Sequence, residues 1–382
     1  MEQDYYHGLL PREDVEGLLV NDGDFLLRLT DLRLKRKVFV ISVRRADKVH
    51  HVLINSKGGK HSVDDKQHNS VNELVHYYWD NNLAVGENKV ELRTPVARQN
   101  WELLHQHVDI SKGKKLGQGA YGEVWSGTLM YEGFLVPVAV KKNRMNKAGK
   151  EQIKRMMAEI RLLRQYDHRN IVKLYGVAAD QEPLLFVMEL VSGGSLDKHL
   201  RSKGPSLTWN DRLSYGLDAA RGLAYLHMCC CLHRDIAARN CLIDQNKTVK
   251  ISDFGLSSEG TTYKVSSARK LPIKWLAIET VVSSIFTTKS DVWSFGVLLW
   301  EICSNAAEPY KGVKVTDVVI QVKKGYRLPA PPDTPPVMDI LMRQCWDADP
   351  DKRPDMSHVR TTLHNAYIQL EPATASSNTC EE

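Results

Sequence analysis

Long apolar runs are absent from this sequence of 382 residues. A helix that crosses a bilayer needs about 18 or more consecutive apolar residues, and no stretch here approaches that length. The first residues, Met1-Glu2-Gln3-Asp4, are acidic and lack the apolar core of a secretory signal peptide. We therefore expect a cytoplasmic protein without a transmembrane segment.

Cysteine is also scarce, and its spacing excludes the common cysteine-based sites. The chain has seven cysteines, an odd number, and no Cys-x-x-Cys pair. Cys229, Cys230 and Cys231 are consecutive, so they cannot readily share one metal ion or bridge one another. Cytosolic thiols stay reduced. We expect reduced thiols in the core, with no disulfide framework and no cysteine metal site.

Charge is balanced over the chain but concentrated in one segment. The hydrophobic fraction of 42% and the charged fraction of 26% are ordinary for soluble domains, and the net charge is +6. Between Arg28 and Lys48 there are eight basic residues and two acidic ones. This segment is either a solvated hairpin face or a site for a phosphate or an acidic lipid surface. Aromatic residues are not interleaved with the charges, so we expect no nucleic-acid partner.

The most informative stretch contains His233-Arg234-Asp235, then Asn240, then Asp253-Phe254-Gly255. Their order and spacing resemble the catalytic and metal-binding loops of protein kinases. Phosphoryl transfer depends on positioned metal ions and on a carboxylate beside the attacking hydroxyl. We expect Asp235 to accept the hydroxyl proton. Asn240 and Asp253 offer hard oxygen ligands for Mg²⁺, with Mn²⁺ as an alternative metal.

A glycine-rich segment precedes these motifs. Two strand-like runs, 124–129 and 136–141, follow its glycines, whereas a dinucleotide-binding fold would place a helix there. In kinases such a segment forms a β-hairpin over the phosphates of ATP. Lys141 would then contact the α- and β-phosphates, oriented by an ion pair with Glu159 on the next helix. The resemblance implies an ATP site formed by Leu116, Gly117, Gln118, Gly119, Ala120, Tyr121, Gly122, Glu123, Val124, Ala139, Lys141, Met188, Glu189 and Val191.

Residues 5–95 predict a smaller α+β unit. Hydrophobic periodicity indicates a helix, three strands and a second helix, at 9–19, 25–29, 38–43, 50–54 and 69–79. Arg28 lies inside the first strand, where an unpaired charge would be costly. The order resembles an SH2 domain, which implies that Arg28 holds a phosphotyrosine phosphate together with Arg12, Thr30 and His51. The alternative is that Arg28 pairs with Asp31 or another carboxylate.

The substrate class follows from a second resemblance. Serine/threonine kinases usually carry lysine two residues after the catalytic aspartate, whereas this chain has Ala237 there and a cation at Arg239. This form, with Leu271-Pro272-Ile273-Lys274-Trp275, resembles tyrosine kinases. Tyr263 is the only tyrosine between Gly255 and Ala277, so we expect it to be the autophosphorylation site. The chain departs from the kinase pattern at Ile278, where proline is usual, and from the SH2 pattern at Leu29.

The resemblance as a whole is to the Fes/Fer group of non-receptor tyrosine kinases. It implies an α+β fold with an SH2 domain (a central antiparallel sheet with two flanking helices) at 1–95, a loosely packed linker at 96–109, a two-lobed protein kinase domain at 110–370 and a disordered tail at 371–382. The implied function is transfer of the γ-phosphate of ATP to protein tyrosines, with the SH2 domain binding phosphotyrosine-containing proteins. We further expect peripheral association with the cytoplasmic face of the plasma membrane. The alternative function is a phosphotyrosine-binding adaptor with a weak or inactive kinase fold.

Overall fold

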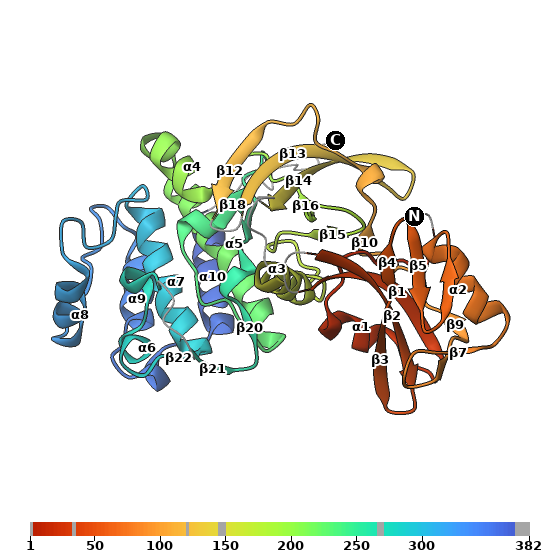
Figure 1. Ribbon diagram of the computed structural model, residues 1–382. Coiled ribbons are helices and arrows are strands. Elements are labelled where there is room, and N and C mark those ends of the chain that lie inside the picture. Colours follow the sequence, from red (N-terminus) through yellow and green to blue (C-terminus); the bar gives the residue numbers. More distant parts are fainter. Residues whose placement is uncertain (1–2, 33–35, 120–121, 144–149, 266–270, 371–382) are drawn as a thin grey trace, which may run out of the picture. The chain divides into compact units, whose positions relative to one another are not determined.

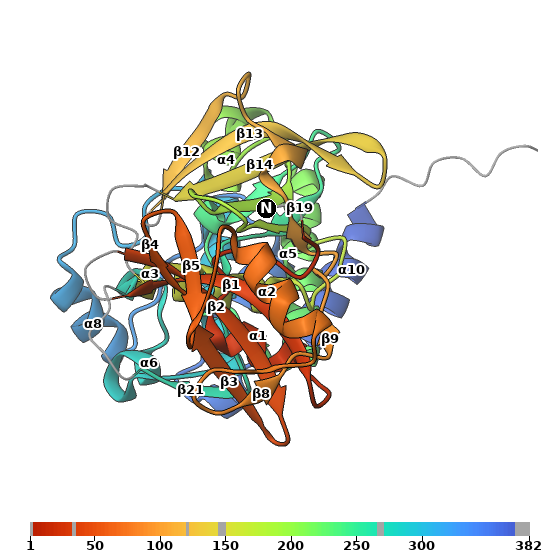
Figure 2. The same cartoon turned by 45° about the vertical axis from the view of Figure 1, so that its right-hand side comes forward.

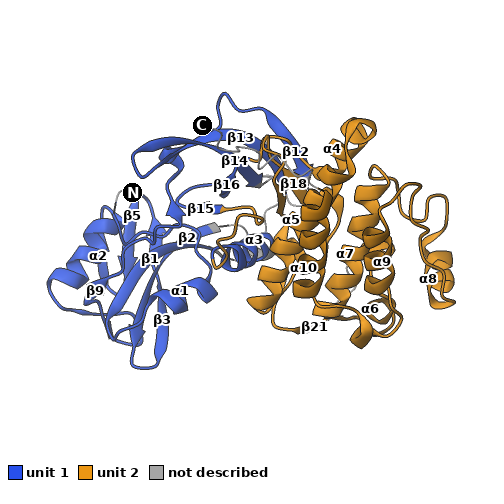
Figure 3. Ribbon diagram, turned by 180° about the vertical axis from the view of Figure 1, so that it is seen from behind, with its two compact units in different colours: residues 1–164, 174–190 blue, residues 165–173, 191–382 orange. Residues whose placement is uncertain are grey.

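The computed structural model describes residues 3–32, 36–119, 122–143, 150–265 and 271–370 (Figure 1). The chain divides into two compact units, which are coloured in Figure 3. Unit 1 contains residues 1–164 and 174–190, and unit 2 contains residues 165–173 and 191–382. Three of the sequence predictions, those for Ala120, for Tyr121 and for the tail at 371–382, lie outside the described residues.

The N-terminal part of unit 1 is built on a four-stranded sheet in the order β3-β2-β1-β9. Residues alternate between the two faces of a strand. Phe25 and Leu27 therefore enter the same apolar cluster as Leu74 and Tyr78 of the second helix, whereas Arg28 lies on the opposite face. The elements are α1 (Arg12–Leu18), β1 (Asp24–Leu32), β2 (Arg36–Arg45), β3 (Lys48–Leu53), α2 (Val71–Asp80) and β9 (Thr94–Pro95).

Small strands that the periodicity did not predict complete this part. They are β4 (Asn55–Lys57), β5 (Lys60–Val63) and β6 (Lys66–His68), which form one sheet, and β7 (Ala84–Val85) and β8 (Val90–Glu91), which pair with each other. Each has two to four residues, which is too short for an alternating pattern to stand out.

The rest of unit 1 is a seven-stranded sheet with one long helix. Figure 2 shows β12, β13 and β14 side by side, in agreement with their antiparallel pairing. The elements are β10 (Glu102–Leu103), η1 (His105–His107), β11 (Val108–Asp109), β12 (Lys115–Gly119), β13 (Gly122–Tyr131), β14 (Phe134–Asn143), α3 (Lys150–Leu163), β15 (Leu174–Ala178) and β16 (Leu185–Glu189). The predicted strands at 124–129 and 136–141 lie within β13 and β14.

The segment 96–109 does not pack loosely, so that part of the prediction is wrong. It contributes β10, which pairs with β15, and β11, which pairs with β13. Leu103 and Val108 are buried in the core of this sheet. Two-residue strands among polar residues leave no periodic signal in the sequence, because the sheet edges that they join come from distant segments.

Unit 2 is mainly helical. Its two longest helices begin with capping boxes, at Thr208 with Asp211 and at Thr287 with Ser290. Every residue of α7 from Ser290 to Cys303 is buried, as its all-round apolar character indicated. The helices are α4 (Leu196–Lys203), α5 (Trp209–Met228), α6 (Ile278–Ser283), α7 (Thr288–Cys303), α8 (Val315–Lys323), α9 (Pro336–Cys345) and α10 (Met356–Leu370).

The connections between the helices of unit 2 contain short strands and 3-10 turns. The strands are β17 (Cys231–Leu232), β18 (Cys241–Ile243), β19 (Val249–Ile251), β20 (Ser258–Glu259), β21 (Thr262–Lys264) and β22 (Ile285–Thr287). The turns are η2 (Gly204–Ser206), η3 (Ala238–Asn240), η4 (Phe254–Leu256), η5 (Ile273–Trp275) and η6 (Pro350–Lys352). Helices and sheets together confirm the predicted α+β class.

The cysteines are partly as expected. The six within the described residues are all free, and Cys231, Cys241, Cys303 and Cys345 are buried. Cys229 and Cys230 are exposed, so their assignment to the core is wrong. The reason is local, because α5 ends at Met228 and the chain turns at Cys230 with a φ of 53°. Within the described part of the chain, no helix combines the length and the apolar character that crossing a bilayer requires.

Candidate functional site

An ion pair joins β14 and α3 in unit 1. The Nζ of Lys141 lies 3.0 Å and 2.9 Å from the two carboxylate oxygens of Glu159. Glu159 is only 6% exposed, because the apolar stripe of α3 turns this helix face inward. A buried charge is stable only when it is paired and hydrogen-bonded. The structure thus brings together the two residues that the sequence predicted to pair.

The glycine-rich segment forms the β12–β13 hairpin. Glu123 lies within an ion pair, with one carboxylate oxygen 2.7 Å from the Nζ of Lys115. Ala139 of β14 is buried and faces Met188 of β16 in the register of the sheet. The other predicted ATP-site residues described in unit 1 occupy the same strands: Leu116, Gly117, Gln118 and Gly119 in β12, Gly122 and Val124 in β13, and Glu189 in β16.

Two buried carboxylates of α7 hold the loop at residues 233–238 in unit 2. Asp291 accepts hydrogen bonds of 2.8 Å from the backbone N–H groups of both His233 and Arg234. Glu301 accepts one of 2.9 Å from the N–H of Ala238. Burial raises the pKa of Glu301 to about 7, against the lowering effect of this N–H donor. The sequence analysis missed both supporting residues, although an acidic residue inside an otherwise apolar helix was a usable signal.

Asp235 lies at the centre of this loop. Its carboxylate is hydrogen-bonded to the guanidinium of Arg239, four residues later. Burial raises the pKa of Asp235, while Arg239 and the Asn240 side chain act in the opposite direction. The guanidinium of Arg239 lies 4.4 Å from the ring centroid of Trp275, so an aromatic surface stands beside the Asp235–Arg239 pair. The pair combines a carboxylate of raised basicity with a fixed cation.

Asn240 and Asp253 are linked through the backbone. The N–H and the hydroxyl of Ser252 both donate 2.8 Å hydrogen bonds to the carbonyl oxygen of Asn240, and Asp253 follows directly. The Nδ2 of Asn240 donates to the carbonyl oxygen of Asp235 at 2.8 Å. Asp253 is exposed and adopts a left-handed conformation with a φ of 61°. Such a backbone costs on the order of 1–3 kcal/mol and is often kept at functional sites.

Tyr263 lies on β21, opposite Phe286 of β22. Its ring is half-buried beneath the guanidinium of Arg234, which also lies 5.3 Å from the Phe286 ring centroid. The predicted autophosphorylation site therefore touches the arginine next to Asp235. Val191, the remaining predicted ATP-site residue, is buried at the start of the long second segment of unit 2.

Ile278 is the first residue of α6, and its neighbour Glu279 forms an ion pair. Glu279 binds the guanidinium of Arg353 bidentately, at 2.7 Å and 2.9 Å. Arg353 is 1% exposed, so this pair is a fixed internal connection. The departure at Ile278 has left both the helix and the ion pair in place.

A pocket of about 370 Å³ in unit 1 is lined by all four residues that the sequence assigned to phosphotyrosine, Arg12, Arg28, Thr30 and His51. Arg28 is 3% exposed and donates to the Oγ of Ser42 at 3.1 Å and to the carbonyl oxygen of Leu10 at 3.4 Å. Neither acceptor carries a charge. Burial lowers the pKa of Arg28 to about 10, which leaves it charged at neutral pH.

Ser42 also determines which ring nitrogen of His51 carries the proton. Because Ser42 accepts from Arg28, its own proton points to the Nδ1 of His51, 2.9 Å away. Burial, Arg28 and Arg12 lower the pKa of His51 to about 4, so the ring is neutral and carries its proton on Nε2. The pocket thus holds cations and a neutral donor, which suits an anion. Ser42 was missed because serine on a strand is an unremarkable residue.

Helix α3 borders the same pocket through Ile153 and Lys154. The Nζ of Lys154 lies 2.8 Å from the Oε1 of Glu13, and Arg161 lies 3.4 Å from Asp14. Burial raises the pKa of Asp14 to about 6. Two ion pairs therefore connect α1, which borders this pocket, to α3, the helix that carries Glu159. Nothing in the local sequence indicates this packing.

Comparisons with known proteins assign both parts of the chain to described families. Residues 110–363 match the model of the family described as protein tyrosine and serine/threonine kinase, and residues 5–78 match that of the SH2 domain. The chain is 39% identical over 371 residues to Fer-related kinase 1 of Caenorhabditis elegans, covering 95% of this chain and 94% of that protein. This is a Fer/Fes-related non-receptor protein tyrosine kinase.

Other relatives of this kinase are longer. Tyrosine-protein kinase Fer of Homo sapiens is 38% identical over 366 residues, which cover 95% of this chain but 44% of the human protein. The transforming protein Fps of avian sarcoma virus strain PRCII is 35% identical over 366 residues, covering 67% of its length. A kinase of this family uses ATP and a divalent metal, acts on proteins and binds phosphotyrosine-containing proteins through its SH2 domain.

Proposed function

We propose that this Fer/Fes-related kinase transfers the γ-phosphate of ATP to tyrosine side chains with Asp235 as the general base. The observation that carries this role is the half-buried Asp235–Arg239 pair beside Trp275. Burial raises the pKa of Asp235, which strengthens it as an acceptor for the phenolic proton. Arg239 would hold the carboxylate in place and offset charge on the transferring phosphate. Trp275 gives a flat substrate ring a surface to lie against.

Lys141 and Glu159 have a positioning role in this proposal. Lys141 would bind the α- and β-phosphates, and Glu159 holds its ammonium group through two oxygens. The glycines of β12 and β13 would let the backbone N–H groups approach the phosphates, with Gly122 at a φ of 157°. Met188, Glu189 and Val191 are proposed to contact the adenine.

Asn240 and Asp253 are proposed to hold Mg²⁺, with Mn²⁺ as the alternative. Their oxygen donors suit a hard divalent cation. The Asn240 amide uses its nitrogen on the Asp235 carbonyl, which turns its oxygen toward a ligand role. A bound cation would neutralise charge on the β- and γ-phosphate oxygens. Ser252 keeps the two ligating residues in a fixed backbone relation.

The SH2 pocket is proposed to deliver substrates that already carry phosphotyrosine. Arg28, Arg12, Thr30 and the Nε2 proton of His51 would bind the phosphate. Tethering makes the second encounter intramolecular, with effective concentrations of about millimolar for short linkers. The basic segment from Arg28 to Lys48 would add long-range attraction that salt weakens. We also propose a cytoplasmic location with peripheral association at the inner face of the plasma membrane.

The proposed function is tested with paired peptides that differ only in tyrosine or serine at the acceptor position. With MgATP we expect phosphate transfer to the tyrosine peptide and none to the serine peptide. Asp235→Asn should lower kcat by at least about 100-fold, the scale of a lost general base, with unchanged thermal unfolding. Phosphotyrosine-peptide binding without any transfer by the parent chain would favour the adaptor function instead.

A further inference from the structure

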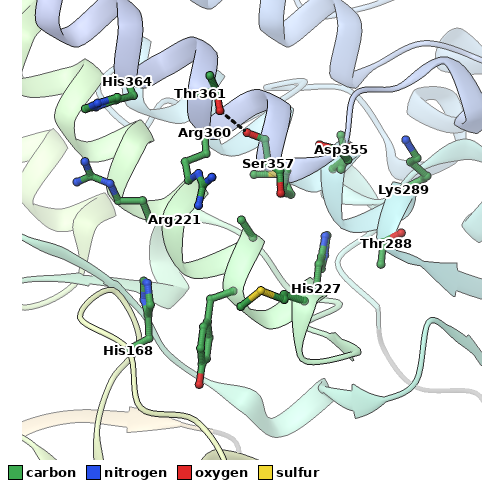
Figure 4. A pocket seen from close by; sticks show the side chains of 15 residues that line it. His168, Arg221, His227, Thr288, Lys289, Asp355, Ser357, Arg360, Thr361 and His364 are labelled. Carbon is green, nitrogen blue, oxygen red and sulfur yellow. Dashed lines mark hydrogen bonds between the residues drawn. The ribbon is translucent and has the colours of Figure 1, made fainter.

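A cavity of about 840 Å³ lies in unit 2, and the proposed function uses none of its residues. Figure 4 shows it between α5, the first turns of α7 and α10, and His168. Ligand sites in proteins usually measure about 300–1,000 Å³. The cavity is therefore large enough for several side chains of a bound partner.

The polar lining includes three basic side chains. Arg221 comes from α5, Lys289 from α7 and Arg360 from α10, and Figure 4 shows Arg360 extending into the cavity. Within the described part of the chain, the guanidinium of Arg360 makes no hydrogen bond and no ion pair. Asp355 is the only acidic residue of the lining, and its carboxylate accepts the backbone N–H of His358 at 2.7 Å, at the start of α10.

His168 lies in the lining of this cavity together with Arg221. Its Nδ1 accepts the backbone N–H of Asn170 at 3.0 Å, and its ring stacks on Tyr225 with 4.8 Å between centroids. The neutral ring therefore carries its proton on Nε2. Burial and the neighbouring Arg221 lower the pKa of His168, although Asp218 forms an ion pair of 3.2 Å with Arg221. Burial and Arg221 thus both favour the neutral form of this ring.

Two helix N-termini also border this cavity. Helix α7 begins at Thr288 and α10 at Met356, and both residues line the cavity. The N-terminus of a helix carries about half a positive charge. Both ends therefore add positive potential near the guanidinium of Arg360, and the carboxylate of Asp355 offsets part of it at the start of α10.

Apolar residues form the rest of the lining. Ala224, Tyr225 and Met228 come from one face of α5, and Val292 and Met356 from α7 and α10. Met228 is 76% exposed, so its apolar side chain is available for contact with a partner. A lone phosphate would engage the cations and leave this surface uncovered. Acidic side chains interspersed with apolar ones would cover both.

We propose that this cavity is a docking site for an acidic peptide segment of a partner protein. Carboxylates of the segment bind Arg360, Arg221 and His168, and its apolar side chains cover Tyr225 and Met228. That the partner is a protein substrate rests on the proposed function. Docking there raises the local concentration of the substrate and lowers KM without changing the chemical step.

The binding test uses a fluorescein-labelled peptide of repeated Glu-Glu-Leu and fluorescence anisotropy, without ATP. Arg360→Glu is the main variant, because this side chain is exposed and loses no partner among the residues that the structure describes. Lys323→Glu on α8 is the control, since it makes the same change in charge at an exposed site outside the cavity. We expect Arg360→Glu to weaken binding about tenfold or more, Lys323→Glu less than twofold, and a Gln-Gln-Leu peptide not to bind.

Equal affinity in the parent and Arg360→Glu would overturn the proposal. Complete competition by millimolar inorganic phosphate would overturn it as well, because the site would then bind phosphate alone. A second experiment measures kinetics with a substrate in which the Glu-Glu-Leu repeat is attached to a tyrosine peptide. The repeat should lower KM severalfold in the parent and not in Arg360→Glu, with kcat and the rate on the short peptide unchanged. Peptide binding by a chain without phosphotransfer would contradict the proposed function but leave the docking site standing.

Discussion

The guanidinium carbon of Arg234 lies 3.9 Å from the centroid of the Tyr263 ring. Arg234 directly precedes Asp235, and its backbone N–H is held by the buried Asp291. A phosphate added to Tyr263 would therefore be added next to a cation that is already fixed to the catalytic loop. Phosphotyrosine carries about −1.5 to −2 charges at neutral pH, enough for new charge-assisted hydrogen bonds. The unmodified contact is a weaker cation–π interaction.

We predict that phosphorylation of Tyr263 raises activity. The parent chain should show a lag with MgATP while Tyr263 becomes modified, followed by a rate about fivefold or more above the initial one. Tyr263→Phe keeps the aromatic ring under Arg234 and should remain at the initial rate. Continuous peptide phosphorylation measures both. A Tyr263→Phe chain that accelerates as the parent does would exclude this residue as the switch.

A second prediction concerns the variant Arg28→Lys in the pocket lined by Arg12, Arg28, Thr30 and His51. Lysine keeps the charge but loses the planar fork, including the hydrogen bond to Ser42. The affinity for a phosphotyrosine peptide should fall about tenfold or more, since hydrogen bonds to charged groups contribute about 1.5–3 kcal/mol. Activity on a primed substrate with several tyrosines should fall with it. The rate on a short unprimed peptide should stay nearly unchanged.

Isothermal titration with the phosphopeptide and parallel kinase assays separate the outcomes. Undiminished affinity would mean that Arg28 does not bind the phosphate. An equal loss on primed and unprimed substrates would indicate a structural role instead. The Glu13–Lys154 and Asp14–Arg161 pairs provide the route for such a role, because they join α1 to the helix of Glu159.

The sequence singled out candidate residues where chemistry and spacing coincide, and their roles stay predictions. Arg28 stood out because a charge inside an apolar strand needs a reason, and Glu159 because it flanks an apolar helical stripe. Ser42, Asp291 and Glu301 were missed, although they orient the predicted residues. Their roles depend on contacts between distant segments, which local periodicity does not encode. The strands β10 and β11 were missed for the same reason, since their partners β15 and β13 define them.

His105 yields a prediction on pH dependence. Its Nδ1 contacts the carboxylate of Asp180 at 2.5 Å and its Nε2 the carbonyl oxygen of Pro183 at 2.8 Å, so both ring nitrogens face acceptors. Burial alone would lower the pKa of His105, but the hydrogen bonds to Asp180 and Pro183 outweigh burial and raise it. Protonated His105 therefore makes its full contribution to the free energy of unfolding below the pKa that histidine has in the unfolded chain, about 6.5. It is lost as the pH rises through the raised folded pKa.

We expect the thermal unfolding midpoint to fall between pH 6 and pH 8.5, and His105→Gln to remove part of this fall. At pH 6 the variant should be less stable by about 2 kcal/mol, the scale of a hydrogen bond to a charged group. His107→Gln, in the same 3-10 turn, is the matched control. If His105→Gln and His107→Gln show the same pH dependence as the parent, His105 is not the titrating group.

Ile278→Pro should be tolerated, although proline inside a helix costs about 3 kcal/mol. Ile278 is the first residue of α6, where the N–H has no intrahelical partner. Ala277 before it has φ −64° and ψ 151°, a conformation that suits a residue preceding proline. We expect the free energy of unfolding to change by less than about 1 kcal/mol. Denaturant titration should show a loss of about 3 kcal/mol for the control Val281→Pro; an equal loss for Ile278→Pro would contradict the helix start assigned here.

The central claim is that Lys141 and Asp235 serve one phosphotransfer reaction on tyrosine. The most direct measurement is mass spectrometric mapping of phosphorylated residues after incubation of the purified chain with MgATP. For the parent we predict phosphotyrosine, including at Tyr263, and no phosphoserine or phosphothreonine. Lys141→Met and Asp235→Asn should each give none while unfolding at nearly the parent's temperature, because each removes a charge that acts mainly on the transition state. Phosphotyrosine at parental levels in either variant would contradict the account.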